Sequence, residues 1–247
     1  MRNSLMVIIL CLSSTLPAQI ADFFDGTKEY HFNAIYIDSI GDTVTREKII
    51  VQPTGKPWVA QPGLQKSFSY IYDANMVDYA NYVDPEAEFR KRDLKYFRKK
   101  GKYRYSKEET TGGFVNESEF YMHPPRRNQY RMLVNGVHPF FYFESLSKKH
   151  HEFNYSHIKF IGMGSFDHNY IVDSLGAILF QYKEIAAWQV QVQSDFLPAT
   201  DFWKTQKYLF DSKLDAIFTT EYGFIKLHYT FKTGIKIQFD LIEVKEI

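Results

Sequence analysis

Residues 188–193 read Trp-Gln-Val-Gln-Val-Gln, and this hexapeptide indicates the fold class of the chain. Its apolar and amide side chains alternate with a period of two. In an extended strand, Trp188, Val190 and Val192 therefore lie on one face and the three glutamines lie on the other. A strand with one buried and one wet face is typical of an antiparallel sheet with a solvated side. The hexapeptide thus predicts a mainly β protein.

The C-terminal region repeats the pattern as a hairpin. Apolar and polar residues alternate over residues 225–232, Thr233-Gly234 turns the chain, and the alternation resumes over residues 235–241. A small barrel can fill its interior with side chains or leave room for a ligand, so the inner face is either plain core or a binding face. The expected inward and candidate ligand-binding residues are Trp188, Val190, Val192, Ile225, Leu227, Tyr229, Ile237 and Phe239.

The first part of the chain also predicts strands. Residues 31–38 and 43–51 are β-prone runs joined by the turn cluster Ser-Ile-Gly-Asp, and they predict a hairpin. Residues 53–63 hold three prolines and two glycines, so we expect a loop there. Strand-like alternation resumes over residues 67–72.

One amphipathic helix is predicted near residues 85–100. Asp84 can cap it, Pro85 suits a first helical position, and the basic residues before Gly101 suit the last turn. Its basic side chains are either a solvated helix face, as charge runs usually are, or a contact surface for an anionic surface or partner. The candidate contact residues are Arg90, Arg92, Lys95 and Lys99.

The composition bounds the class of protein. The 247 residues are 45% hydrophobic and 17% aromatic with a formal net charge of +1, which excludes a disordered chain and gives no sign of nucleic-acid binding. Residues 19–247 show no linker or repeat, so we expect one β-rich domain whose N-terminal third is looser. The predicted architecture is a curved antiparallel sheet or half-barrel that carries the single helix.

Residues 1–18 resemble a secretory signal peptide, with Arg2 at the start, an apolar run and an exit at Leu16-Pro17-Ala18. We expect secretion across the inner membrane to the periplasm or the exterior, and no transmembrane segment in the mature chain, because the apolar run is too short to span a bilayer. Cleavage removes Cys11, the one cysteine. A lipid-modified Cys11 is the alternative, although Leu10 stands where a lipoprotein signal needs a small residue.

Motifs for reaction chemistry are missing from the sequence. It has no Gly-x-Ser-x-Gly elbow, no thiol after residue 18 and no phosphate-binding loop, so we expect no cofactor. Histidines and carboxylates do gather between His150 and His168, and such groups can ligate zinc. His150 and His151 are neighbours, however, and point to opposite faces of a strand, so we expect polar surface here and no metal site.

Three segments carry a resemblance to a known family. They are Phe-Tyr-Met-His-Pro-Pro-Arg at residues 120–126, His-Pro-Phe at 138–140, and residues 221–230. Together they resemble uncharacterised secreted proteins and lipoproteins of the Bacteroidota over roughly residues 115–245. The resemblance implies a β-rich second half in which a tryptophan strand precedes a Gly-Phe hairpin, and it implies no activity. The hairpin is also similar, more loosely, to the closing strands of half-barrel lipoprotein carriers.

Two functional hypotheses follow. The first is a non-enzymatic exported protein that binds an apolar or amphipathic, lipid-like ligand or docks an envelope protein, because the chain offers aromatic surface and strand edges but no reaction motif. The alternative is an envelope hydrolase that acts on glycan, ester or lipid through scattered carboxylates and histidines.

Overall fold

A computed structural model describes residues 23, 26–61, 63–72, 108–125, 139–160, 164–205, 207 and 210–247. The expected signal peptide at 1–18 and the expected helix at 85–100 lie outside the described residues. So do the four candidate contact residues Arg90, Arg92, Lys95 and Lys99, which stay predictions.

Twelve strands form one antiparallel sheet with the order β6-β5-β4-β3-β2-β1-β12-β11-β10-β9-β8-β7. The strands of the first half are β1 (Lys28–Ile37), β2 (Thr43–Pro57), β3 (Lys66–Tyr72), β4 (Glu108–Val115), β5 (Glu119–Met122) and β6 (Phe140–Tyr142). Those of the second half are β7 (His150–Phe160), β8 (Gly164–Phe180), β9 (Lys183–Pro198), β10 (Ser212–Thr219), β11 (Gly223–Phe231) and β12 (Lys236–Glu246). The short helices are η4 (Phe143–Ser147), a 3-10 turn, and α4 (Asp201–Thr205).

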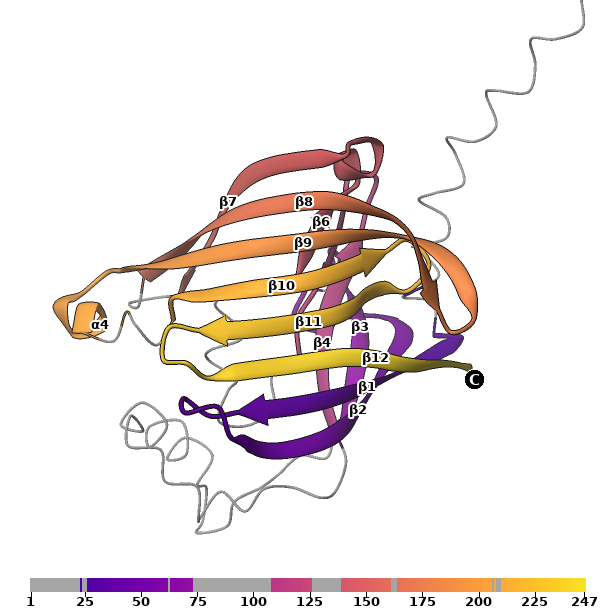
Figure 1. Cartoon of the computed structure of the whole chain (residues 1–247), viewed down its shortest axis with the longest axis horizontal. Helices are drawn as coiled ribbons and strands as arrows, with labels where there is room; N and C mark the ends of the chain where they lie inside the picture. The colour runs from indigo at the N-terminus through magenta and orange to yellow at the C-terminus, as the bar shows by residue number, and fades with distance from the viewer. Residues whose placement is uncertain are drawn as a thin grey trace, which may run out of the picture.

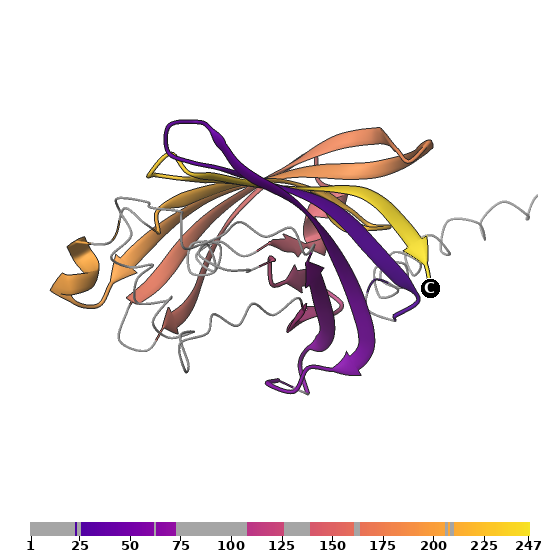
Figure 2. The ribbon, with the colours of Figure 1, turned by 90° about the horizontal axis from the view of Figure 1, so that it is seen from below.

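The sheet bends back on itself to make two layers. Strands β7–β12 with β1 form an arched broad layer, and β3–β6 form a cross layer that runs crosswise behind it (Figures 1 and 2). Strand β2 belongs to the same ladder and links the two. The predicted curved antiparallel sheet is confirmed. Its two end strands, β6 and β7, are not paired with each other, so the sheet is not closed into a barrel.

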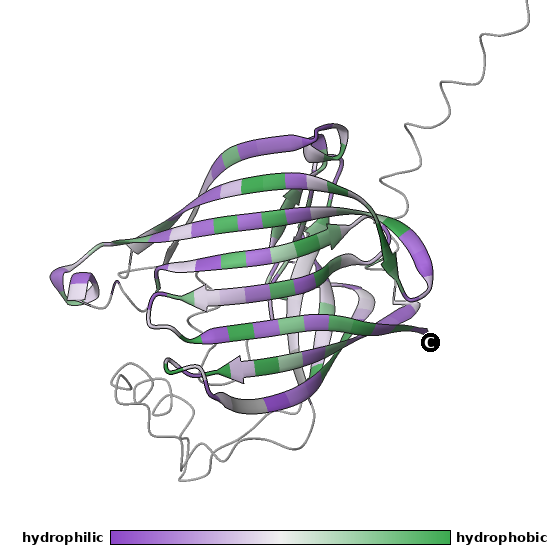
Figure 3. Ribbon diagram, in the orientation of Figure 1, coloured by the Kyte–Doolittle hydropathy of each residue, from purple (hydrophilic) through white to green (hydrophobic). Residues whose placement is uncertain are grey.

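The hexapeptide that predicted the fold lies in β9, and its faces are as expected. Trp188, Val190 and Val192 are buried, while Gln191 and Gln193 are exposed. The same alternation of apolar and polar residues is visible along most strands of the broad layer (Figure 3). The C-terminal hairpin is confirmed as β11 and β12, and the N-terminal hairpin as β1 and β2. The period-two signal was sufficient here because it depends only on which face of each strand is buried.

The loop expected over residues 53–63 is wrong in its first half. Strand β2 continues to Pro57, and Pro53 pairs with Phe68 of β3. The described pairing of β2 with β1 ends at Val51. Pro53 and Pro57 lack a backbone N–H, and they lie beyond the part of β2 that hydrogen-bonds to β1. The described residues 58–61 and 63–65 that follow β2 form turns and bends.

Aromatic rings hold the two layers together. Phe141 of β6 stacks on Phe218 of β10 with ring centroids 3.9 Å apart. Phe120 of β5 lies 5.4 Å from Phe218 and 5.9 Å from Phe224 of β11. All four rings are at most 2% exposed. Each buried ring contributes hydrophobic free energy of about 2–3 kcal/mol, so this contact anchors the cross layer to the arch.

Candidate functional site

The concave face of the broad layer brings most of the predicted inward residues together. Hydrogen-bonded register aligns Val190, Ala216, Leu227 and Phe239 in one row across β9–β12. The adjacent row holds Tyr170, Val192, Leu214, Tyr229 and Ile237. Directly paired residues of an antiparallel sheet lie on the same face. Six of the eight expected inward and candidate ligand-binding residues therefore lie in these two rows.

Trp188 shares that face at its end, opposite Phe218, whereas Ile225 is placed differently. A bulge between Ile217 and Phe218 puts Phe224 opposite Phe218 and leaves Ile225 as the unpaired extra residue of β11. Strict alternation along the sequence cannot show a bulge, because the bulge adds one residue to one strand only. Phe224 thus belongs to the face that the sequence assigned to Ile225.

Tyr229 is the polar group at the centre of this face. Its side chain is 0% exposed, and its hydroxyl has no hydrogen-bond partner in the part of the chain that the structure describes. Its ring contacts are with Phe231 and Phe239, both on the broad layer. Burial raises the pKa of Tyr229 well above its ordinary value, and the neighbouring hydroxyls of Tyr170 and Tyr121 raise it further. The phenol is therefore neutral at every physiological pH and carries a proton that it can donate.

A second donor lies at the Phe218 end of the same face. The indole N–H of Trp188 is buried and lacks a hydrogen-bond partner among the described residues. The ring packs against Phe141 of the cross layer at 5.9 Å. Buried tyrosine and tryptophan usually find a partner for the O–H or N–H, so two such donors on one face are unusual.

Aromatic rings also bridge the two ends of the sheet. Phe140 of β6 stacks on Tyr155 of β7 with centroids 5.0 Å apart, and Tyr142 packs edge-on against Phe153 at 4.7 Å. Burial raises the pKa of Tyr155, as does the carboxylate of Glu119. The arch is therefore bounded on this side by side chains rather than by a hydrogen-bonded ladder.

The other end of the concave face is polar. Register aligns His168, Ser194 and Ser212, all at most 2% exposed, in the row next to Tyr170. Burial lowers the pKa of His168 to about 4, opposed by the nearby Asp167 carboxylate. The imidazole is thus neutral at pH 7, and we interpret the row as a packed polar end of the core.

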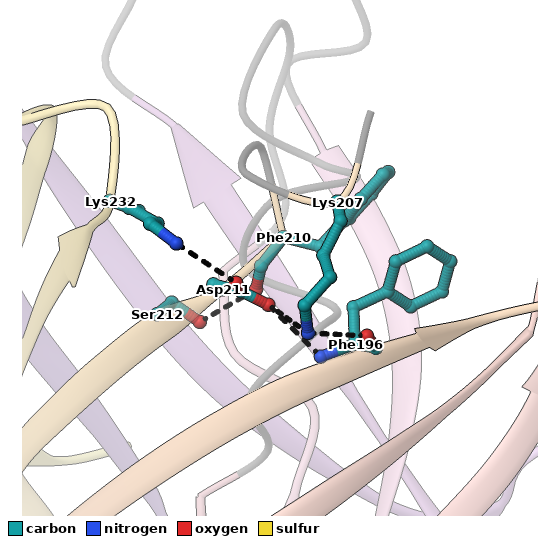
Figure 4. Close-up of polar contacts among 6 residues, drawn as sticks. All are labelled: Phe196, Lys207, Phe210, Asp211, Ser212 and Lys232. Atoms are coloured by element: carbon teal, nitrogen blue, oxygen red, sulfur yellow. Dashed lines mark hydrogen bonds and ion pairs between the residues drawn. The ribbon is translucent and has the colours of Figure 1, made fainter. Parts of the chain in front are cut away.

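Asp211 fastens the chain beside this polar row (Figure 4). Its side chain is 9% exposed, and Oδ1 accepts a hydrogen bond from the Phe196 backbone N–H at 3.1 Å. Lys207 lies 3.1 Å from Oδ1 and Lys232 lies 3.7 Å from Oδ2. The Lys207 ammonium also donates to the Phe196 carbonyl oxygen at 2.7 Å. The carboxylate therefore connects β9, the start of β10 and the β11–β12 turn, which is a structural role.

The histidine-rich segment lies on edge strand β7. His150 is exposed and held between two carboxylates, with Nδ1 2.7 Å from Asp173 and Nε2 3.0 Å from Glu152. Hydrogen bonds to Asp173 and Glu152 raise its pKa. His151 is on the opposite side and contacts the Ser145 hydroxyl at 2.8 Å. Within the described ranges, no group of three or more His, Cys, Asp or Glu side chains could hold a metal ion.

The comparisons with known proteins give distant similarity only. Neither a protein-family model nor a curated protein matches the sequence. A solved structure of a candidate lipoprotein from Parabacteroides distasonis is similar at 11% identity and a TM-score of 0.41, over 90% of this chain and 98% of that chain. A candidate outer membrane lipoprotein-sorting protein domain from Vibrio parahaemolyticus is similar at 9% identity and a TM-score of 0.29, over 94% of this chain and 90% of that chain.

Several residues of the site were not anticipated. Phe120 and Phe141 of the cross layer and Tyr170 of β8 contribute as much to the concave interior as the predicted residues do. The sequence shows that aromatic residues are abundant, but the positions of these three rings depend on pairing between distant strands.

No helix in the described ranges is long and apolar enough to cross a membrane.

Proposed function

We propose that the protein is an exported binding protein that holds an amphipathic, lipid-like ligand against the concave face of the broad layer. The observation that supports this most is the Tyr229 hydroxyl, a fully buried donor with no partner among the described residues. A buried polar group left unsatisfied costs about 1–3 kcal/mol, and a ligand oxygen at this point would recover that free energy.

The surroundings of Tyr229 suit a ligand with one polar end. The adjoining row, with Val190, Leu227 and Phe239, is entirely apolar and suits a hydrocarbon chain. Phe218 and Phe224 already contact Phe120 of the cross layer, whereas the ring contacts of Tyr229 among the described residues are with Phe231 and Phe239.

The first test is native mass spectrometry of the protein purified without detergent from its host. An added mass that disappears on denaturation supports the proposal, and a bare mass combined with no uptake of a fluorescent fatty acid overturns it.

The second test concerns Tyr229 itself. We expect Tyr229→Phe to weaken binding of a fluorescent fatty acid about tenfold or more, because a hydrogen bond to a carboxylate contributes about 1.5–3 kcal/mol. The matched control is Tyr222→Phe, which removes a hydroxyl that hydrogen-bonds Glu221 in the β10–β11 turn and leaves the concave face unchanged. Equal affinities of Tyr229→Phe and the wild type would reject Tyr229 as the ligand contact.

A further inference from the structure

Both layers contribute phenol groups to the interior where Tyr229 lies. The cross layer lies on the concave side of the arch (Figure 2). On the broad layer, Tyr170 shares the row of Tyr229 and is likewise 0% exposed. On the cross layer, Tyr121 of β5 pairs directly with Phe140 of β6, and the Phe140 ring centroid is 6.0 Å from that of Tyr170. Directly paired residues share a face, so Tyr121 faces the row that holds Tyr170 and Tyr229.

The hydroxyls of these three tyrosines are close enough to influence one another. Burial raises the pKa of Tyr229 most, and the hydroxyls of Tyr170 and Tyr121 raise it further. Burial also raises the pKa of Tyr170, with further contributions from other tyrosines that include Tyr121. Electrostatic effects weaken with distance, so the hydroxyls gather in one part of the interior. Tyr170 and Tyr229 keep their protons at physiological pH.

Tyr121 connects this part of the interior to a histidine. Tyr121 is 8% exposed, and its hydroxyl lies 3.1 Å from Nδ1 and 3.3 Å from Nε2 of His123. The His123 ring packs edge-on against the ring of Tyr121 at 5.1 Å and that of Trp58 at 5.7 Å. A protonated imidazole donates to the hydroxyl oxygen and leaves the hydroxyl proton for another acceptor. Tyr121 is then a donor with a positive charge behind it.

We propose that the polar end of the ligand is a carboxylate, which Tyr229 holds from the broad layer and Tyr121 holds from the cross layer. This inference rests on the proposed function, because it names the headgroup of the ligand assigned to the concave face. A carboxylate has two acceptor oxygens, so it can take one hydrogen bond from each phenol. An ammonium group has donors only, and it would leave the Tyr229 proton without an acceptor.

The electrostatics favour a charged acceptor over a neutral one. Hydrogen bonds in which one partner is ionised are about twice as strong as neutral ones. A buried anion also needs a positive charge nearby, because removing it from water is otherwise unfavourable. His123, which contacts Tyr121, can supply that charge. We therefore expect the ligand to be a free acid rather than its ester.

The test is native mass spectrometry of the full chain mixed with equal concentrations of laurate and methyl laurate. The two lipids have the same hydrocarbon chain, so the ratio of the two bound species reports the headgroup alone. We expect the wild type to bind laurate about tenfold more strongly than methyl laurate, because the charge strengthens two hydrogen bonds.

Two variants assign this preference to residues. Tyr121→Phe removes one donor and its link to His123, so we expect the preference for laurate to fall by about threefold or more while methyl laurate binding is unchanged. His123→Gln keeps a hydrogen-bonding partner for Tyr121 but carries no charge, so it should lower the same ratio without disturbing the fold. The matched control is Tyr222→Phe, whose hydroxyl contacts Glu221 outside the concave face and which should keep the wild-type ratio.

The outcomes separate this inference from the proposed function. The inference is overturned if the wild type binds methyl laurate as strongly as laurate, or if either Tyr121→Phe or His123→Gln keeps the wild-type ratio. Those results leave the proposed lipid site standing. Uptake of neither lipid by the wild type counts against the lipid site and overturns the inference with it.

Discussion

Replacing Tyr229 with phenylalanine should stabilise the ligand-free protein. The side chain is 0% exposed and its hydroxyl has no hydrogen-bond partner in the described structure, so the folded state carries a desolvation penalty that the unfolded chain does not. That penalty is about 1–3 kcal/mol, and part of it is offset by the small void that loss of the oxygen leaves. We expect the free energy of unfolding to rise by about 1 kcal/mol, or Tm by about 2–4 °C for a chain of this size.

The matched comparison is Tyr36→Phe. Tyr36 lies on the same face, 5% exposed, and its hydroxyl donates to Glu47 Oε1 at 2.5 Å. Removing this satisfied hydroxyl should lower the free energy of unfolding by about 1 kcal/mol. Urea titration followed by circular dichroism measures both variants, on protein refolded after extraction of any bound lipid. The two changes should have opposite signs.

Ligand should reverse the order of stability. A ligand at 100 times its Kd adds about 2.7 kcal/mol to the wild type, and a variant with tenfold weaker affinity gains about 1.4 kcal/mol. The advantage of Tyr229→Phe should therefore disappear in saturating fatty acid. If Tyr229→Phe destabilises the stripped protein as much as Tyr36→Phe does, the hydroxyl has a partner in solution and the reasoning fails.

Two further predictions concern the polar end of the core. Burial lowers the pKa of His168 to about 4, below its ordinary value of 6.5, so the unfolded chain binds a proton that the folded protein does not. Protonation of the unfolded chain should therefore lower the free energy of unfolding by about 3 kcal/mol between pH 6.5 and pH 4, and urea titrations should show a shallower fall for His168→Phe than for the wild type. Asp211→Asn should lower the free energy of unfolding by about 2 kcal/mol by removing a largely buried, charged acceptor, whereas Asp201→Asn should change it by less than about 0.5 kcal/mol. Thermal unfolding that ranks Asp211→Asn with Asp201→Asn would contradict the structural role of Asp211.

Local patterns of the sequence predicted the strands, and non-local pairing decided the rest. Alternation placed Trp188, Val190 and Val192 on the buried face, because successive side chains of a strand point to opposite faces and a few neighbouring residues are enough to show this pattern. The cross layer depends instead on β1 pairing with β12, residues some 200 positions apart in the chain, which no window of the sequence contains. The position of Phe141 on Phe218 follows from that pairing.

The candidate site was predicted to a similar extent. Seven of the eight expected inward residues share one face, but neither the bulge at Ile225 nor the burial of His168 could be predicted from the sequence. A bulge changes register by one residue without a marked change in composition. His168 was assigned to a polar surface because its neighbours in sequence are polar, yet alternate residues of a strand face opposite sides.

The feature that supports the proposed ligand contact is a local departure from the most stable choice of residue. Phenylalanine at position 229 would remove a buried hydroxyl that has no hydrogen-bond partner among the described residues. The carboxylate of Asp211, by contrast, is held by a backbone N–H and two lysines, and these contacts account for it as a structural residue. Departures from local consistency are where function is expected to be found, because stability alone would remove them.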